Sequence, residues 1–215
     1  MTTLFPISLT CPICSTEFES NEIGSCGFAS KRTDFRPNYW GMNPVRYFYH
    51  ICPECGYCAN KKLFQEEIKS KEIKQRIKGL NALGNPSLPE KIERAMICLE
   101  ILNKHAIVHL NDFQLANSWI NAFWWSENEE QKQKFAQIIL TYLKKALKNN
   151  DLEKNNTALA MYLIAEINRR IGNEEKAEKF FDEVISLAKD NNDIEKLHAL
   201  AKQQKTEPQD TIDIE

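Results

Sequence analysis

Two short stretches, Cys11-Pro-Ile-Cys14 and Cys52-Pro-Glu-Cys-Gly-Tyr57, decide the fold of the N-terminal part of this chain. Each contains two cysteines separated by two residues, and together they supply the four thiolates that a tetrahedral zinc ion requires. Proline after the first cysteine fixes φ, and Gly56 after the second pair allows a positive φ, so both suit tight turns. The sequence therefore predicts one structural zinc ion bound by Cys11, Cys14, Cys52 and Cys55.

The spacing of the two pairs differs from that of a compact zinc ribbon. The segment from Ser15 to Ile51 separates them, whereas a compact ribbon has roughly 15–20 residues at this place. We therefore expect a zinc-ribbon-like module with a long insertion. The alternative is a pair of redox-active thiol motifs, which should lie near a βαβ pattern. Whether Cys26 or Cys58 replaces a ligand, or the two share a reversible disulfide, stays open.

Composition limits the class of protein. The chain has 215 residues, 42% of them hydrophobic, and a formal net charge of −2, so it can bury one large or two small cores but has no global attraction for nucleic acid or anionic membranes. The start of the sequence has no secretory signal pattern, and no stretch approaches the roughly 18 apolar residues of a membrane span. Seven cysteines, an odd number, favour the reducing cytoplasm.

Composition also changes near residue 62, where Pro, Gly, Cys and aromatic residues give way to Ala, Leu, Ile, Glu and Lys. We predict a zinc-ribbon-like module over residues 1–62, an α-helical domain over 63–204 and a disordered polar tail over 205–215. Within the first, Val45 to Ile51 has the β-branched and aromatic residues of a strand. Thr33 to Pro44 has two prolines and a glycine, which indicates an irregular loop.

The pattern beyond residue 62 is helical. Apolar residues from Leu63 to Leu80 mark one amphipathic helix. Ser87 to Glu90 and Ser126 to Glu129 match capping boxes, which begin two further helices. Large aromatic side chains dominate helix packing, so we expect the tryptophans of this part to lie in the core between helices: Trp119, Trp124 and Trp125.

The stretch from Ala158 to Lys189 resembles a tetratricopeptide repeat, in which two antiparallel helices meet through small and large residues. Ala165 of its first helix, with Ala177 and Phe181 of its second, matches the small and aromatic positions. The resemblance implies a mainly α fold, with a small β module at the N-terminus followed by a stack of helical hairpins. It also implies a groove that takes a protein or peptide partner, and we expect exposed residues near its wall: Tyr162, Glu166, Arg169 and Arg170.

The aromatic insertion admits two interpretations. Small zinc modules often borrow aromatic side chains as core, and Phe35, Tyr39 and Trp40 would then be buried against the ribbon or the helices. In the alternative, the segment is a recognition surface for a partner. The residues that would form this surface are Asp34, Arg36, Tyr39, Trp40, Asn43 and Arg46.

An ordered series of motifs resembles a bacterial family known as domain of unknown function 2225. The series consists of CPIC with Phe18 after it, TDFRPNYWGMNP from Thr33 to Pro44, CPECGY from Cys52 to Tyr57, and the helical YLIAEINRRIGN. The resemblance covers most of the chain. It implies a small cytosolic protein with a cysteine-rich head and a helical tail, and no established activity.

The sequence favours a non-catalytic protein. It contains no zinc-protease, phosphate-loop or kinase motif, and a four-cysteine zinc has no open position for water. We therefore expect a protein-interaction or scaffold module; the alternative is a nucleic-acid-binding ribbon. In that alternative the basic residues near the insertion contact phosphates, while Tyr39 or Trp40 stacks on bases. The cations in question are Lys31, Arg32, Arg36 and Arg46. If they lie together on one exposed face, a nucleic-acid partner is favoured; if they are scattered or paired with acidic residues, a protein partner is favoured.

Overall fold

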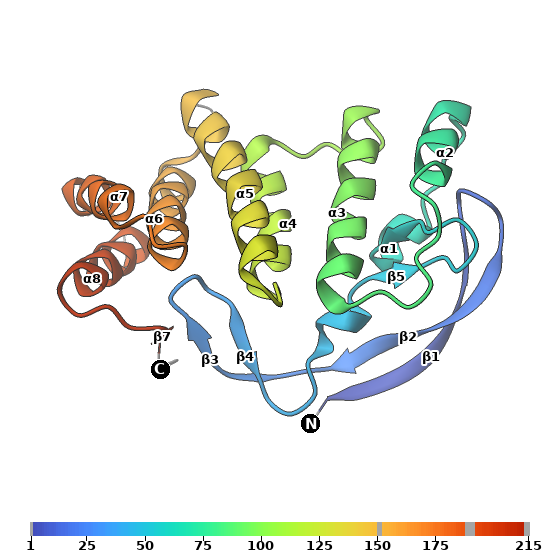
Figure 1. Ribbon diagram of the computed structural model, residues 1–215, viewed down its shortest axis with the longest axis horizontal. Helices are drawn as coiled ribbons and strands as arrows, with labels where there is room; N and C mark the ends of the chain where they lie inside the picture. Colours follow the sequence, from blue (N-terminus) through green and yellow to red (C-terminus); the bar gives the residue numbers. More distant parts are fainter. Residues whose placement is uncertain (1, 150–151, 188–191, 213–215) are drawn as a thin grey trace. The chain divides into compact units, whose positions relative to one another are not determined.

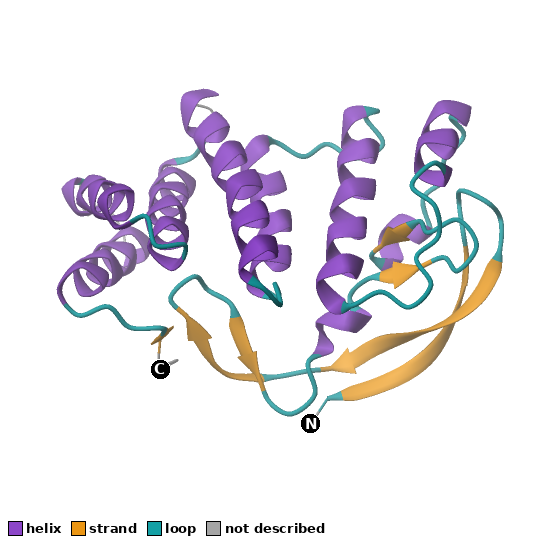
Figure 2. Cartoon of the chain, viewed as in Figure 1, coloured by secondary structure: helices purple, strands orange, loops and turns teal. Residues whose placement is uncertain are grey.

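The chain is mainly helical and carries short antiparallel sheets, which confirms the predicted class at this level. A computed structural model describes residues 2–149, 152–187 and 192–212 (Figure 1, Figure 2). The chain forms two compact units. The first comprises residues 1–28 and 39–110, and the second comprises residues 29–38 and 111–215.

Two β-hairpins carry the two cysteine pairs of the first unit. Strands β1 (Thr3–Thr10) and β2 (Glu17–Ser25) pair antiparallel, and the first Cys pair lies in the turn between them. Strands β5 (His50–Ile51) and β6 (Cys58–Ala59) pair around the second. Each Cys-x-x-Cys turn, called a knuckle below, is therefore the tip of a hairpin. The hairpin backbone fixes the direction in which both sulfurs of a pair point.

The predicted strand over residues 45–51 is wrong in its first half. The 3-10 helix η1 (Pro44–Tyr47) occupies that part, and only β5 follows as a strand. Asn43 decides the local structure, because its side-chain oxygen accepts a hydrogen bond from the Val45 N–H at 3.1 Å and caps the helical turn.

Three helices complete the first unit: α1 (Lys61–Phe64), α2 (Lys71–Lys78) and α3 (Leu88–Lys104). The predicted continuous helix over residues 63–80 is thus two helices with a break. Ser70 begins α2 as its N-cap and accepts a hydrogen bond from Ile73 N–H. The predicted capping box of Ser87 and Glu90 is present at the start of α3.

The cysteine hairpins and the helices of the first unit share one hydrophobic core. Cys11, Cys52 and Tyr57 belong to the same buried cluster as Ile77 of α2 and Leu102 of α3. Because this core crosses residue 62, the compact units do not divide at the predicted domain boundary.

Polar contacts reinforce this shared core. The Tyr57 hydroxyl donates to the Leu63 carbonyl oxygen at 3.2 Å. The buried Arg94 guanidinium of α3 donates to the carbonyl oxygens of Leu80 and Gly56 at 2.9 and 3.4 Å. The second knuckle is therefore held by helix α3 as well as by its own hairpin.

Five helices build most of the second unit: α4 (Asp112–Trp124), α5 (Glu129–Asn149), α6 (Lys154–Arg170), α7 (Glu174–Ser186) and α8 (Asn192–Thr206). Figure 1 shows α4 and α5 side by side, and α6 packs against α5, α7 and α8. The predicted capping box at Ser126 is wrong. Asn128 accepts from the Gln131 N–H instead, and the Ser126 hydroxyl donates to the Phe123 carbonyl oxygen.

The tryptophans of the second unit differ in burial. Trp119 is buried with its ring 6.1 Å from that of Phe135, as predicted for a core residue. Trp124 and Trp125, at the end of α4, are only half-buried. The predicted core location is therefore only partly correct for these two residues.

Small and large side chains meet between the last three helices. Ala165 of α6 and Ala177, Phe181 and Val184 of α7 lie in one buried cluster, which Ile194 of α8 also joins. The residues that match the repeat pattern in the sequence therefore share a core.

A small sheet joins two distant parts of the second unit. Its strand order is β4 (Pro37–Tyr39), β3 (Phe28–Arg32), β7 (Thr211–Ile212). The expected irregular loop thus contains strand β4. The expected disordered tail contains the end of α8 and strand β7, whereas residues 213–215 lie outside the described residues. Gln204 stabilises the turn before β7, because its side-chain amide bonds the Gln209 backbone at both N–H and C=O.

Substitution of Ile77 tests the shared core of the first unit. Ile77→Ala removes a fully buried side chain and should lower the free energy of unfolding by about 2–5 kcal/mol, whereas Ile77→Val should lower it by about 1 kcal/mol. Hydrogen exchange should accelerate in the cysteine hairpins as well as in α2. Unchanged protection of the hairpins in Ile77→Ala would contradict a common core.

Candidate functional site

Four cysteine sulfurs converge at the tips of the two hairpins of the first unit. All four Sγ atoms, of Cys11, Cys14, Cys52 and Cys55, lie within 4.8 Å of one another. The Cys11–Cys55 and Cys14–Cys52 pairs are each 3.5 Å apart. A disulfide requires about 2.05 Å between sulfurs, whereas tetrahedral bonds of about 2.3 Å to one ion place them roughly 3.8 Å apart. The four predicted ligands are therefore positioned to hold a metal ion.

Backbone hydrogen bonds shape both knuckles in the same way. Ser15 N–H donates to the Cys11 carbonyl oxygen at 2.9 Å, and Gly56 N–H donates to that of Cys52 at 3.0 Å. Ser15 and Gly56 both have positive φ, 66° and 70°. A Cβ atom on Gly56 would collide with the Asn81 carbonyl oxygen. The second knuckle thus needs glycine both for its turn and for the close approach of the loop after α2.

The electrostatics of the cluster call for a cation. A hydrogen bond from the Cys55 thiol lowers the pKa of Cys11 to about 5. Burial raises the pKa of Cys52 to about 11, against backbone hydrogen bonds that act in the opposite direction. Burial and mutual repulsion thus oppose the ionisation of more than one of these thiols. A divalent ion would offset this cost, because it stabilises every thiolate bound to it.

The predicted recognition segment is divided between the two units. Asp34 and Arg36 belong to the second unit, and the rest from Tyr39 to Arg46 belongs to the first. Asp34 is fully buried, so it cannot be part of an exposed surface. Arg36 is half-buried and donates to the Trp124 carbonyl oxygen at 3.1 Å.

The part of this segment in the first unit contains a strongly exposed tryptophan. Trp40 is 59% exposed, whereas the Tyr39 ring lies 6.4 Å from that of Phe48. Asn43 caps η1, and the Arg46 guanidinium donates to the Pro86 carbonyl oxygen at 3.4 Å. Among these four predicted residues, Trp40 is therefore the best placed to contact a partner.

Two residues expected to be exposed on a groove wall are buried, and this expectation is wrong. Tyr162 and Glu166 both have 0% exposure. The turn of the β3–β4 hairpin covers them: the Tyr162 hydroxyl donates to the Thr33 carbonyl oxygen at 2.9 Å, and the Tyr162 ring lies 5.5 Å from that of Phe35. The sequence of α6 gave no indication of the hairpin that packs on these residues.

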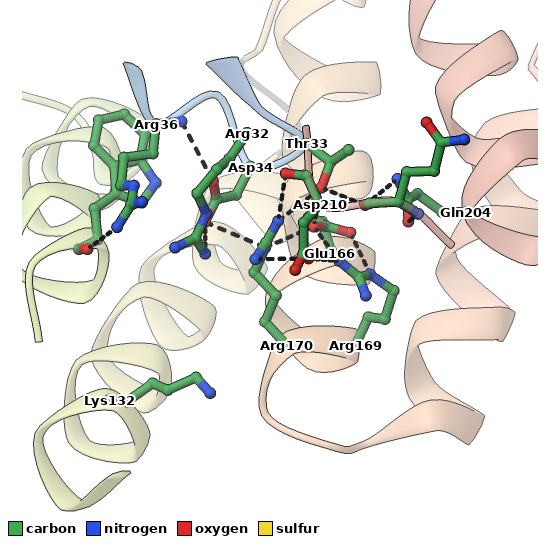
Figure 3. A network of polar contacts seen from close by, with 12 residues as sticks. Arg32, Thr33, Asp34, Arg36, Lys132, Glu166, Arg169, Arg170, Gln204 and Asp210 are labelled. Atoms are coloured by element: carbon green, nitrogen blue, oxygen red, sulfur yellow. Dashed lines mark hydrogen bonds and ion pairs between the residues drawn. The ribbon is translucent and has the colours of Figure 1, made fainter. Parts of the chain in front are cut away.

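Glu166 is the centre of a buried ionic network (Figure 3). Its carboxylate accepts hydrogen bonds from the guanidinium groups of Arg169 and Arg170 at 2.9 and 2.7 Å, and from the Thr33 hydroxyl at 2.6 Å. Asp210 lies 3.4 and 3.3 Å from the same two arginines. Burial opposes ionisation of Asp210, but the charges of Arg170 and Arg169 outweigh it and lower its pKa.

A third carboxylate extends this network to the hairpin. Asp34 accepts from Arg32 at 2.8 Å and lies 3.3 Å from Arg170. Most members of the network lie in segments that the sequence marks as candidate sites, but Asp210 does not: it lies 40 residues from Arg170, in a stretch with no structural pattern. No local signal could have identified it.

Residues 4–208 match the sequence model of a family described as "Uncharacterized protein conserved in bacteria (DUF2225)". The chain belongs to this family. The match includes all four clustered cysteines and the ionic network except Asp210, which lies just beyond the matched residues. No curated protein and no solved structure shows significant similarity to the chain.

The remaining cysteines of this DUF2225 protein lie outside the cluster. Cys26 is exposed, and Cys58 and Cys98 are buried. Cys58 donates to the Lys91 carbonyl oxygen at 3.4 Å, and burial raises its pKa. The cluster is therefore complete with the four predicted cysteines, without either of the two that the sequence left open.

None of the helices among the described residues combines the length and the apolar character that a membrane crossing needs.

Neutralising the buried Glu166 should destabilise the second unit. In Glu166→Gln, Arg169 and Arg170 lose the carboxylate that both contact, and breaking a buried ion pair by removing one partner costs about 3–5 kcal/mol. Urea unfolding followed by circular dichroism measures the loss. Glu175→Gln, an exposed position on α7, is the matched control and should change stability by less than about 0.5 kcal/mol. A loss below about 1 kcal/mol for Glu166→Gln would contradict the assigned role.

Proposed function

We propose that this DUF2225 protein is a non-catalytic, zinc-dependent protein-interaction or scaffold protein of the cytoplasm. One observation carries the proposal: four cysteine sulfurs meet within 4.8 Å at the core of the first unit. A four-cysteine set in this arrangement is typical of zinc. Four protein sulfurs fill a tetrahedral zinc and leave no position for water or substrate, so the metal has a structural role.

The location of the cluster explains what the zinc would do. Each Cys pair lies at the tip of a hairpin, and the strands of the second hairpin, β5 and β6, have only two residues each. Hairpins this small are marginal by themselves. Because metal binding becomes folding free energy in such modules, zinc would lock both hairpins together and onto α2 and α3, with which they share a core.

The positions of the basic residues favour a protein partner over nucleic acid. Arg32 pairs with Asp34 at 2.8 Å, and the Arg36 guanidinium lies over the Trp125 ring. Arg46 belongs to the other unit and bonds a backbone carbonyl oxygen. Cations that are paired and divided in this way do not form the continuous basic face that a phosphate backbone requires.

Exposed apolar residues of the first unit support a protein-binding surface. Trp40 and Met42 follow β4 and are 59% and 43% exposed, and Phe5 of β1 is 43% exposed. Tryptophan and methionine are enriched at protein interfaces, and tryptophan often dominates their binding energy. We infer that the loop around Trp40 contacts the partner.

A repeat-like stack of helices would provide a second surface for a peptide in its groove. Support for this interpretation comes from α6 and α7, where Ala165, Ala177 and Phe181 share one core as tetratricopeptide-like hairpins require. Arg169 and Arg170 are 21% and 8% exposed at their side chains, so they would offer only limited contact area to a peptide.

Native mass spectrometry tests the metal. The purified protein should carry one zinc per chain, and Cys52→Ser should lose it because only three thiolates remain. Since the cluster lies in the core shared with α2 and α3, Cys52→Ser should also lose helical circular dichroism from the first unit, and a strong chelator should have the same effect on the unsubstituted protein.

Cys26→Ser is the matched control, because Cys26 is an exposed cysteine of the same unit outside the cluster. It should retain one zinc and full stability. Folded, metal-free protein purified under reducing conditions would refute a structural zinc.

Site-specific photocrosslinking tests the partner surface. A p-benzoylphenylalanine residue at position 40 should crosslink a protein in native cytosol, whereas the same residue at position 69, where the polar Lys69 is highly exposed, should not. Mass spectrometry of the adduct shows whether the crosslinked partner is a protein or a nucleic acid. Nuclease-sensitive adducts at position 40 would favour the nucleic-acid alternative, and equal protein adducts at both positions would count against a specific surface.

A further inference from the structure

A cleft of about 410 Å³ lies in the second unit beside the ionic network. Five cationic side chains reach it from three elements: the β3–β4 hairpin, α5 and α6. Figure 3 shows the arginines of the hairpin and of α6 close together, and Lys132 on the neighbouring helix. The cationic residues that line the cleft are Arg32, Arg36, Lys132, Arg169 and Arg170.

The carboxylates of the network do not offset this charge fully. Asp34 and Glu166 are buried beneath the arginines, and only Asp210 reaches the cleft. Four arginines therefore face three carboxylates, an excess of one positive charge. Lys132 forms an ion pair with Glu129 at 3.0 Å, but the Glu129 side chain is 76% exposed, so water weakens that pair.

Arg36 has the least compensated charge in the cleft. Its guanidinium lies 5.0 Å from the centre of the Trp125 ring and donates to the Trp124 carbonyl oxygen, and it forms no ion pair with a carboxylate among the described residues. Burial, and next the charge of Arg32, lower the pKa of Arg36. An anion in the cleft would relieve both effects.

Buried donors without an acceptor occur in the same place. Arg32 Nε, Arg36 Nε and Trp124 Nε1 are buried and have no hydrogen-bond partner among the described residues. A buried N–H without an acceptor is costly, so native proteins rarely leave several together. Three such donors at one cationic cleft point to a ligand that presents several acceptor oxygens.

We propose that this cleft binds the phosphate group of a small phosphate ester. A phosphate presents three terminal oxygens in different directions, and guanidinium groups bind such oxyanions through paired charge-assisted hydrogen bonds. The cleft has the size of a small-molecule site and exceeds what a phosphate ion fills. Phe123 and Trp124 line the remaining space, and they would contact the organic part of the ester.

The site is independent of the zinc cluster and of the surface around Trp40, because all its residues belong to the second unit. Isothermal titration of the full-length protein with inorganic phosphate, ribose 5-phosphate and adenosine 5′-monophosphate tests it, and ³¹P NMR follows the phosphate signal directly. We expect an ester to bind more tightly than inorganic phosphate. Tighter binding of the nucleotide than of the sugar phosphate would place the base against Trp124.

Arg36→Gln should weaken binding about tenfold or more, because it removes one charged hydrogen-bonding group. Arg76→Gln changes the net charge equally at an exposed position outside the cleft and should leave binding unchanged. If Arg36→Gln does not fold, Lys132→Gln, at the partly exposed rim of the cleft, provides the test instead. It should lower the affinity for the phosphate compound about threefold, because it weakens only the long-range attraction for the anion. The proposal fails if no phosphate compound binds at millimolar concentration, if succinate binds as tightly as the phosphates, or if the cleft variants bind as the control does.

Discussion

The clustering of four thiols in a space only 4.8 Å across constrains the whole first unit. Like charges at such separations repel strongly inside a protein, so the four sulfurs can be thiolates together only around a cation. The second hairpin has strands of only two residues each, and the cysteines of both hairpins share a core with α2 and α3. Binding of a metal ion at these sulfurs would therefore be coupled to core formation in this unit.

The second unit also buries several like charges, and there arginine side chains compensate them where a metal ion would do so in the first unit. Asp34 and Glu166 are fully buried. Asp34 is paired with guanidinium groups from both the hairpin and α6, whereas Glu166 is paired with two from α6 and accepts from the Thr33 hydroxyl of the hairpin. Such networks require every member, because one missing partner leaves a buried charge uncompensated. The network binds the turn between β3 and β4 to α6 through Thr33 and Arg170. It also leaves a surplus of positive charge at the surface.

Local sequence patterns predicted much of the structure, and the predictions that were wrong concern residues whose environment depends on long-range packing. The Cys-x-x-Cys spacing identified all four members of the cluster, because two residues between cysteines allow both sulfurs of a pair to reach one ion. The alternation of small and large residues in α6 and α7 predicted which side chains meet. Burial of Tyr162 and Glu166 could not be predicted, because it depends on a hairpin more than a hundred residues away. Asp210 and strand β7 are likewise defined by their partners and not by their own sequence.

The second unit is discontinuous, because residues 29–38 leave the first unit, complete the second and return. Thr33 contacts Gln209, which is separated from it by 176 residues, and Lys31 pairs with Ile212. During synthesis the ribosome releases this hairpin long before α6 and β7, and at roughly 5–20 residues per second the delay lasts on the order of ten seconds or more. Until α6 is synthesised, Asp34 lacks the Arg170 guanidinium that reaches it from that helix. Contacts of such high sequence separation also slow folding in general. The nascent chain thus carries an unpaired strand edge that only the last part of translation can cover.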